Sequence, residues 1–151
     1  MSMYWSGYEV LGCVIMRENL EYFKEKYLQY CIENTSDFND MEREEQMELL
    51  NEWIVYNDCY KLDVIYINEE QFEGVNMQPL DNSWVEIYEG DMPFIIVAAE
   101  KQPYTRGILK NGFYANSNEI IAEFKDKIGK FLPPNFDFAA NIGDVSYACF
   151  A

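Results

Sequence analysis

Near its start the chain reads Tyr8-Glu9-Val10-Leu11-Gly12-Cys13-Val14-Ile15-Met16. The apolar run that begins at Val10 is continuous, which is typical of a strand buried on both faces. We therefore expect residues 8–16 to form a central strand of a sheet. Cys13 in this run, and Cys149 near the other end of the chain, are expected to pack as small apolar side chains.

Two amphipathic helices are expected after this strand. The first extends from about Glu18 to Glu33, because apolar residues recur there at intervals of three and four. Asn39 or Asp40 is expected to cap the second helix, which ends near Tyr56. The buried side of the second helix is predicted to consist of Met47, Leu50 and Ile54, with Leu49 and Trp53 beside them.

The second half of the chain predicts mostly strands. They are expected at 62–67, 84–88, 93–101 and 145–150, with a polar loop at 68–83 and a turn at 89–91. Asn111-Gly112 favours a tight hairpin turn within 105–114. A third helix is expected from Asn116 or Ser117 to Gly129, with four residues facing inward: Ile120, Ile121, Phe124 and Ile128. The predicted fold is a single α+β domain over 1–151, an antiparallel-rich sheet with about three helices packed on one face.

The composition indicates an ordered protein that does not span a membrane. Of the 151 residues, 49% are hydrophobic and 17% aromatic, which is too rich for a disordered acidic tail. The longest apolar run, 94–99, is far shorter than the ~20 residues of a transmembrane helix. The N-terminus has no basic segment followed by an apolar one, and the four cysteines form no C-x-x-C pair. A reduced, cytoplasmic protein is therefore expected.

The charge of the chain is large and unevenly distributed. With 27 acidic residues, 11 basic residues and no histidine, the formal net charge is -16. Residues 37–100 contain 17 carboxylates but only Arg43 and Lys61 as basic residues, a net charge of -15. Solubility of a small domain needs a net charge of only about 2–8 in magnitude. The acidic region 37–100 therefore suggests a role beyond solubility.

The second predicted helix concentrates this charge on one side. Asp40, Glu44, Glu48 and Glu52 recur every four residues, so they are expected to form a column with neighbours about 6 Å apart along the axis. The helix dipole favours acidic residues in the first turn, but it does not account for Glu48 and Glu52. The predicted partner-binding residues are this column together with Glu45, Tyr56, Asp58 and Tyr60, because the two tyrosines are the aromatic residues expected to be exposed.

Two interpretations of this column remain open from the residues alone. A charge run is often only a solvated helix face. The sharper interpretation is a surface that imitates a polyanion, since duplex DNA carries about one negative charge per 1.7 Å of axis. In composition and charge layout the chain is similar to phage-encoded inhibitors of restriction or CRISPR nucleases, and to bacterial immunity proteins that cap basic toxins. The resemblance implies a non-enzymatic, DNA-mimicking inhibitor of a basic nuclease or, alternatively, an antitoxin-like protein bound to a cationic toxin.

The sequence offers little catalytic machinery. Without histidine there is no Ser-His-Asp or Cys-His pair and no imidazole metal ligand, and the chain has no glycine-rich phosphate loop. We expect no catalytic residue, cofactor or metal; a hydrolase that uses a carboxylate-bound metal is the least favoured alternative. The charge disfavours direct binding to nucleic acid or membranes, whereas a homo-oligomer is compatible with it. The helix dipole accounts for Lys125, Lys127 and Lys130 at the end of the third helix, so they are not interpreted as a nucleic-acid patch.

Overall fold

The structure, a computed structural model, describes residues 5–70, 72–81, 85–99, 104–105 and 117–150. Its centre is a seven-stranded sheet in which every pairing is antiparallel, in the order β2-β5-β1-β7-β3-β4, with β6 also paired to β1. The strands are β1 (Trp5–Ile15), β2 (Val64–Ile67), β3 (Phe72–Pro79), β4 (Val85–Ile87), β5 (Phe94–Ala98), β6 (Tyr104–Thr105) and β7 (Ile142–Phe150).

Strand β1 lies inside the sheet, as its continuous apolar run predicts. Along one edge it pairs with β7 from Trp5 opposite Phe150 to Cys13 opposite Ile142. Along the other edge its second half pairs with β5, from Gly12 opposite Ala98 to Ile15 opposite Ile95. Cys13 is fully buried, so the prediction for this cysteine is confirmed; the side chain of Cys149 lies outside the described residues.

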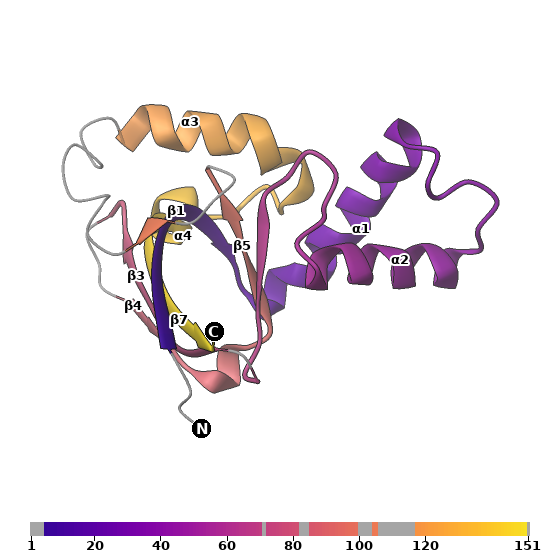
Figure 1. Ribbon diagram of the computed structural model, residues 1–151. Coiled ribbons are helices and arrows are strands. Elements are labelled where there is room, and N and C mark those ends of the chain that lie inside the picture. The colour runs from indigo at the N-terminus through magenta and orange to yellow at the C-terminus, as the bar shows by residue number, and fades with distance from the viewer. Residues whose placement is uncertain (1–4, 71, 82–84, 100–103, 106–116, 151) are drawn as a thin grey trace, which may run out of the picture.

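Three longer helices cover one face of the sheet: α1 (Arg17–Asn34), α2 (Arg43–Val55) and α3 (Ser117–Ile128). Short helical turns are η1 (Glu89–Asp91), η2 (Gly129–Phe131) and α4 (Phe138–Asn141). Buried residues of α1, α2 and α3 form one apolar cluster with Cys13, Ile15, Ile95 and Val97 of the sheet. Figure 1 shows α3 along one side of the curved sheet and α1 with α2 as a pair beside it. The predicted α+β fold with helices on one face is confirmed.

The opposite face of the sheet carries a second apolar cluster. Val10 and Val14 of β1 pack there with Phe94 and Ile96 of β5 and with Val145 of β7. None of the described helices contributes a buried residue to this cluster. Alternate residues of β1 therefore face two different cores, which explains why the apolar run is continuous.

The predicted loop at 68–83 is wrong, because it contains β3. This strand lies between β7 and β4, and its Val75 and Met77 are buried in the second cluster. Gly74, Asn76 and Gln78 alternate with those two residues and give the segment the composition of a loop. The strand forms because β7 and β4 satisfy its backbone groups on both edges, a tertiary effect that local propensity does not report.

The start of α2 also differs from the prediction. The helix begins at Arg43, after Glu42 as N-cap, and neither Asn39 nor Asp40 caps it. Asp40 has a φ of 62°, in the left-handed region, and so ends the preceding turn. The turn is held against α2 because Phe38 is buried with its ring centroid 4.9 Å from that of Trp53, and Gln46 donates a 3.3 Å hydrogen bond to the Phe38 carbonyl.

The third predicted helix is confirmed in α3. Phe124 and Ile128 are buried, and Ile120 and Ile121 pack half-buried against the same cluster. The expected hairpin around Asn111-Gly112 lies outside the described residues, as does Trp84. No helix in the described part of the chain is both long and apolar enough to cross a membrane.

Candidate partner-binding surface

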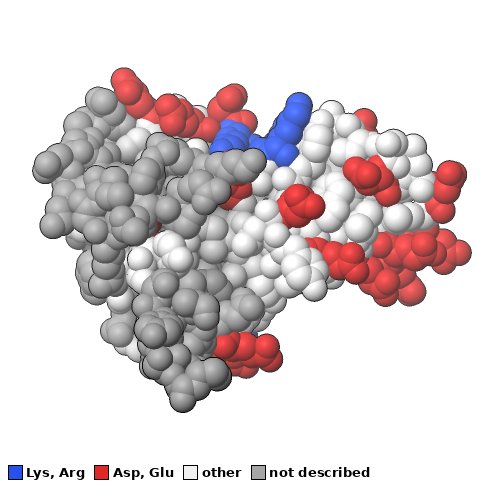
Figure 2. Space-filling view, viewed as in Figure 1, with Lys and Arg blue, Asp and Glu red and all other residues white. Residues whose placement is uncertain are grey.

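Helix α2 has an apolar side and a fully acidic side. Leu50 and Ile54 are 0% and 1% exposed and anchor the helix in the first cluster. Four glutamates are exposed, and three of them form the column that the four-residue spacing predicts: Glu44, Glu48 and Glu52, with Glu45 beside them. Figure 2 shows Asp and Glu side chains gathered over the end of the molecule that α1 and α2 form.

The one basic residue within α2 is paired with a residue of α1. Arg43 is the sole lysine or arginine between Lys26 and Lys61. Its guanidinium donates to the carboxylate of Glu25 on α1, and both side chains are about half exposed. Among the described residues, none of Glu44, Glu45, Glu48 and Glu52 forms an ion pair. The acidic side of α2 therefore faces solvent with its charges uncompensated.

A shallow groove of about 400 Å³ runs along the C-terminal half of this side, lined by Glu48, Asn51, Glu52, Val55 and Tyr56. Val55 is 45% exposed and Tyr56 is 77% exposed, which is unusual for large apolar side chains. The Oδ1 atom of Asn51 is buried at this site and accepts no hydrogen bond from any residue that the structure describes. The groove therefore combines carboxylates with an accessible aromatic ring and an unused acceptor.

The other predicted residues lie in the turns at the two ends of α2. The prediction that Asp40 begins the column is wrong, because Asp40 lies exposed in the turn before α2 with a φ of 62°. Asp58 is exposed in the turn after the helix. Tyr60 is half-buried, with its ring centroid 6.1 Å from that of Tyr30. The expected exposure is thus confirmed for Tyr56 and wrong for Tyr60, because the chain turns back onto α1 between them.

The turn after α2 is tied firmly to the rest of the fold. The Asp58 amide donates a 2.8 Å hydrogen bond to the Trp53 carbonyl, and the Tyr66 amide donates a 3.1 Å bond to Oδ1 of Asn57. The buried hydroxyl of Tyr27 on α1 donates to the Tyr60 carbonyl. These bonds hold the end of α2, and with it Tyr56, in a defined position.

Two thiols lie near one another here, Cys59 within this turn and Cys31 on α1. Burial raises the pKa of Cys59 to about 12 and that of Cys31 to about 11. Burial also raises the pKa of the neighbouring Tyr27 hydroxyl. Both thiols are therefore protonated at neutral pH, which makes them poor nucleophiles and poor metal ligands.

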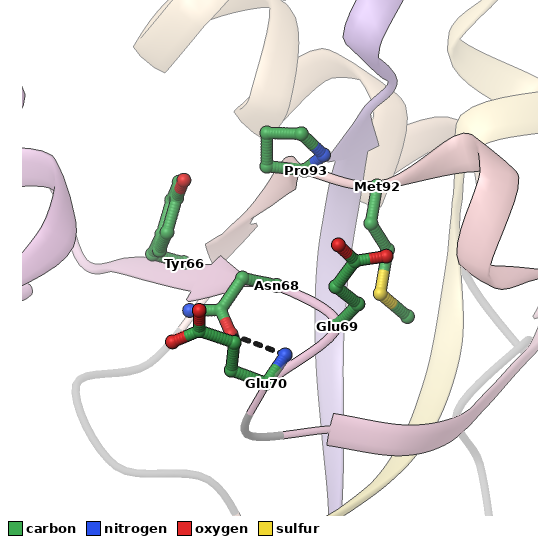
Figure 3. A pocket seen from close by; sticks show the side chains of 6 residues that line it. All are labelled: Tyr66, Asn68, Glu69, Glu70, Met92 and Pro93. Atoms are coloured by element: carbon green, nitrogen blue, oxygen red, sulfur yellow. Dashed lines mark hydrogen bonds between the residues drawn. The ribbon is translucent and has the colours of Figure 1, made fainter.

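A second hollow, of about 300 Å³, lies beyond the end of β2 and is lined by Tyr66, Asn68, Glu69, Glu70, Met92 and Pro93 (Figure 3). Oδ1 of Asn68 accepts a 2.9 Å hydrogen bond from the Glu70 amide, which shapes the turn. Two of the described carboxylates, Glu69 and Glu70, border the hollow, and both side chains are exposed. In the part of the chain that the structure describes, no three Cys, Asp or Glu residues gather as metal ligands would.

Val55 and Asn51 were not predicted as site residues. The spacing in the sequence could have identified both residues, because positions 48, 51, 52 and 55 lie on one side of a helix. An apolar residue on an amphipathic helix normally belongs to its buried stripe, so the sequence does not predict an exposed Val55.

Comparison with protein-family models, with curated proteins and with solved structures gave no match in any of the three cases.

Proposed function

We propose that the protein is a non-enzymatic inhibitor that binds a basic, nucleic-acid-binding protein of the nuclease type through the acidic side of α2. One observation supports this proposal above all. Glu44, Glu48 and Glu52 form an exposed column that makes no ion pair with the described residues, and the column leads into a groove with two exposed apolar side chains.

The column has dimensions suited to a basic groove. Eight residues separate Glu44 from Glu52, so the column spans roughly 12 Å of helix axis. Lysine and arginine side chains that normally contact phosphates would form charge-assisted hydrogen bonds with these carboxylates. Because the charges are exposed, they are expected to accelerate and orient association more than they add affinity.

The exposed end of α2 is expected to supply the remaining affinity. Aromatic residues in desolvated pockets often dominate interface energies. Tyr56 is highly exposed, and the turn behind it is held by hydrogen bonds, so little ordering is required when it enters a pocket. Apolar anchors of this kind also suit a cationic toxin as partner, which keeps an antitoxin-like role as the second candidate.

The test is a pull-down from bacterial lysates that express candidate nucleases, eluted with a salt gradient and analysed by mass spectrometry. The matched variants reverse three charges on α2 (Glu44→Lys, Glu48→Lys, Glu52→Lys) or three on α3 (Glu119→Lys, Glu123→Lys, Asp126→Lys). We expect the wild type and the α3 variant to retain a basic nuclease that elutes at moderate salt, and the α2 variant to lose it.

Two further results decide the proposal. Duplex DNA added to the purified complex should displace the inhibitor, and the inhibitor should reduce cleavage by the nuclease. Retention of the partner by the α2 variant at low salt would show that the column is not the binding surface. Recovery of a toxin without nucleic-acid affinity would favour the antitoxin-like alternative.

A further inference from the structure

Beyond the acidic surface, the structure contains a small basic hollow of about 50 Å³, which we call the lysine pocket. It is lined mainly by three lysines and three aromatic residues: Lys61, Lys127, Lys130, Tyr30, Tyr60 and Phe131. Figure 2 shows basic side chains gathered between α3 and the pair formed by α1 and α2. The pocket thus joins three segments that are far apart in the sequence.

Aromatic rings position two of the ammonium groups. The Nζ atom of Lys130 lies 4.3 Å from the ring centroid of Tyr30 and 5.2 Å from that of Phe131. The Nζ atom of Lys61 lies 5.3 Å from the centroid of Tyr60. Since the centroids of Tyr30 and Tyr60 are 6.1 Å apart, the two ammonium groups are held over neighbouring rings.

No carboxylate among the described residues forms an ion pair with these lysines. In the described part of the chain, Lys61, Lys127 and Lys130 form no ion pair, although the protein has 27 acidic residues. Lys127 makes only a long hydrogen bond of 3.4 Å, to the carbonyl of Ala98. Each ammonium group carries three donors and no acceptor, so the pocket offers an excess of donors to an anion.

The helix dipole accounts for only part of this arrangement. Lys127 and Lys130 lie at the end of α3 and in η2, where cations are favoured. Lys61 comes from the turn after α2 and has a φ of 56°, a left-handed conformation that is costly for a lysine. The hydrogen bond from Tyr27 to the Tyr60 carbonyl fixes this turn, so the third lysine is brought to the pocket by the fold itself.

We propose that the lysine pocket binds a single phosphate group, either inorganic phosphate or the phosphate of a monoester. A cavity needs about 10–15 Å³ for each water-sized group, so the pocket has room for about four oxygen atoms. Three ammonium groups match a phosphate dianion better than a carboxylate, which would leave most of their charge uncompensated. The Tyr30 and Tyr60 rings are already covered by ammonium groups, so they do not offer a stacking surface to a base.

Among the described residues, the lysine pocket and the groove on α2 share no lining residue. Charges further away than about 8–10 Å are largely screened at physiological ionic strength, so the local lysines determine the field within the pocket. The variant with three reversed charges on α2 should therefore bind phosphate like the wild type. Failure of the pull-down and failure of phosphate binding are consequently separate results.

The test is a titration with inorganic phosphate, and in parallel with glycerol 3-phosphate, at pH 7.5 and constant ionic strength, followed by 31P NMR. We expect saturable binding of at least one of the two, weakened at least tenfold by Lys61→Gln and by Lys130→Gln. The matched control is Lys26→Gln, which removes an ammonium 5.6 Å from the ring centroid of Tyr22 on the exposed side of α1. This control should bind as the wild type does.

Three results would overturn the proposal. They are the absence of saturable binding for both phosphates, equal competition by acetate at the same ionic strength, and an equal loss of binding in Lys26→Gln. Circular dichroism of each variant, compared with the wild type, ensures that a loss of binding does not arise from unfolding. Lys61 and Lys130 are both exposed, so glutamine at either position is expected to leave the fold intact.

Discussion

Helices α2 and α3 are similar in length, and both pack apolar side chains into the first cluster. They differ in how their charged residues are placed relative to the helix dipole. The last turn of α3 carries Lys125 and Lys127, as the helix dipole favours, and its first turn carries Glu119. The last turn of α2 carries no basic residue, and Glu52 lies there instead. Glu119, Lys125 and Lys127 therefore contribute to the stability of α3, whereas Glu48 and Glu52 oppose that of α2. A requirement other than helix stability therefore explains the acidic residues Glu48 and Glu52 of α2 better than the dipole does.

The largest expected effects concern the buried sides, where the two helices should behave alike. Leu50→Ala in α2 and Phe124→Ala in α3 should each lower the free energy of unfolding by about 2–5 kcal/mol, because both side chains are buried in the first cluster. Urea denaturation followed by circular dichroism measures both. A loss below about 1 kcal/mol for Leu50→Ala alone would mean that α2 is only loosely docked.

This buried pattern is the part of the fold that the sequence predicts best. The three- and four-residue spacing of Leu50 and Ile54, and of Phe124 and Ile128, is a property of each helix alone. The strand β3 was missed because its stability comes from β7 and β4, which are distant in sequence. The start of α2 was misplaced because the packing of Phe38 on Trp53 decides where the turn ends.

The next effect concerns the turn that follows α2 and depends on pH. Burial raises the pKa of Cys59 from its ordinary 9.0 to about 12, so the folded protein keeps a proton that the unfolded chain loses. The contribution of this thiol to stability is therefore complete below pH 9 and is lost progressively between pH 9 and 12. Between pH 9 and 10 the wild type should lose about 1 kcal/mol more than Cys59→Ala.

Denaturation curves of the two proteins at pH 8, 9 and 10 provide this measurement. Only the change with pH is compared, because Cys59→Ala also removes packing at all pH values. Parallel pH profiles for the two proteins would show that the Cys59 thiol is accessible to water in solution.

A smaller effect, with opposite sign, is expected on the acidic side of α2. Replacing Glu48 and Glu52 by glutamine removes two like-charge pairs at four-residue spacing, Glu44 with Glu48 and Glu48 with Glu52, and one unfavourable interaction with the dipole. The free energy of unfolding should rise by about 0.7 kcal/mol. The matched pair in α3, Glu119→Gln with Glu123→Gln, should change stability little, because Glu119 is favoured in the first turn.

Thermal and urea denaturation at low salt should resolve this difference, and 1 M sodium chloride should reduce it. If the α2 pair destabilised the protein instead, its carboxylates would have to be paired in solution, and the contrast between the two helices would disappear.

The smallest effect on stability is expected at Tyr56. Tyr56→Ser should change the free energy of unfolding by less than about 0.5 kcal/mol, because the side chain is mostly exposed. Under the proposed function, the same substitution should weaken binding of the partner at least tenfold, as measured by titration calorimetry. Unchanged affinity would restrict the interface to the carboxylates.

The two surface sites differ in how far the sequence predicts them. The acidic column is visible from the four-residue spacing of Glu44, Glu48 and Glu52, because all three residues lie in one helix. The lysine pocket is not visible in this way. Lys127 and Lys130 are adequately explained by their own helix, and only the folded turn at Tyr60 and Lys61 adds the third ammonium group. Tyr60 was misjudged for the same reason.

The position of β1 in the sheet also determines how the chain behaves during its synthesis. Both main neighbours of β1 are made later, and β7 begins 127 residues after β1 ends. At about 5–20 residues per second, the ribosome leaves the apolar β1 segment without its longest partner for roughly 6 to 25 s. The acidic segment of α1 and α2 is synthesised directly after β1, and its like charges repel other nascent chains throughout that interval.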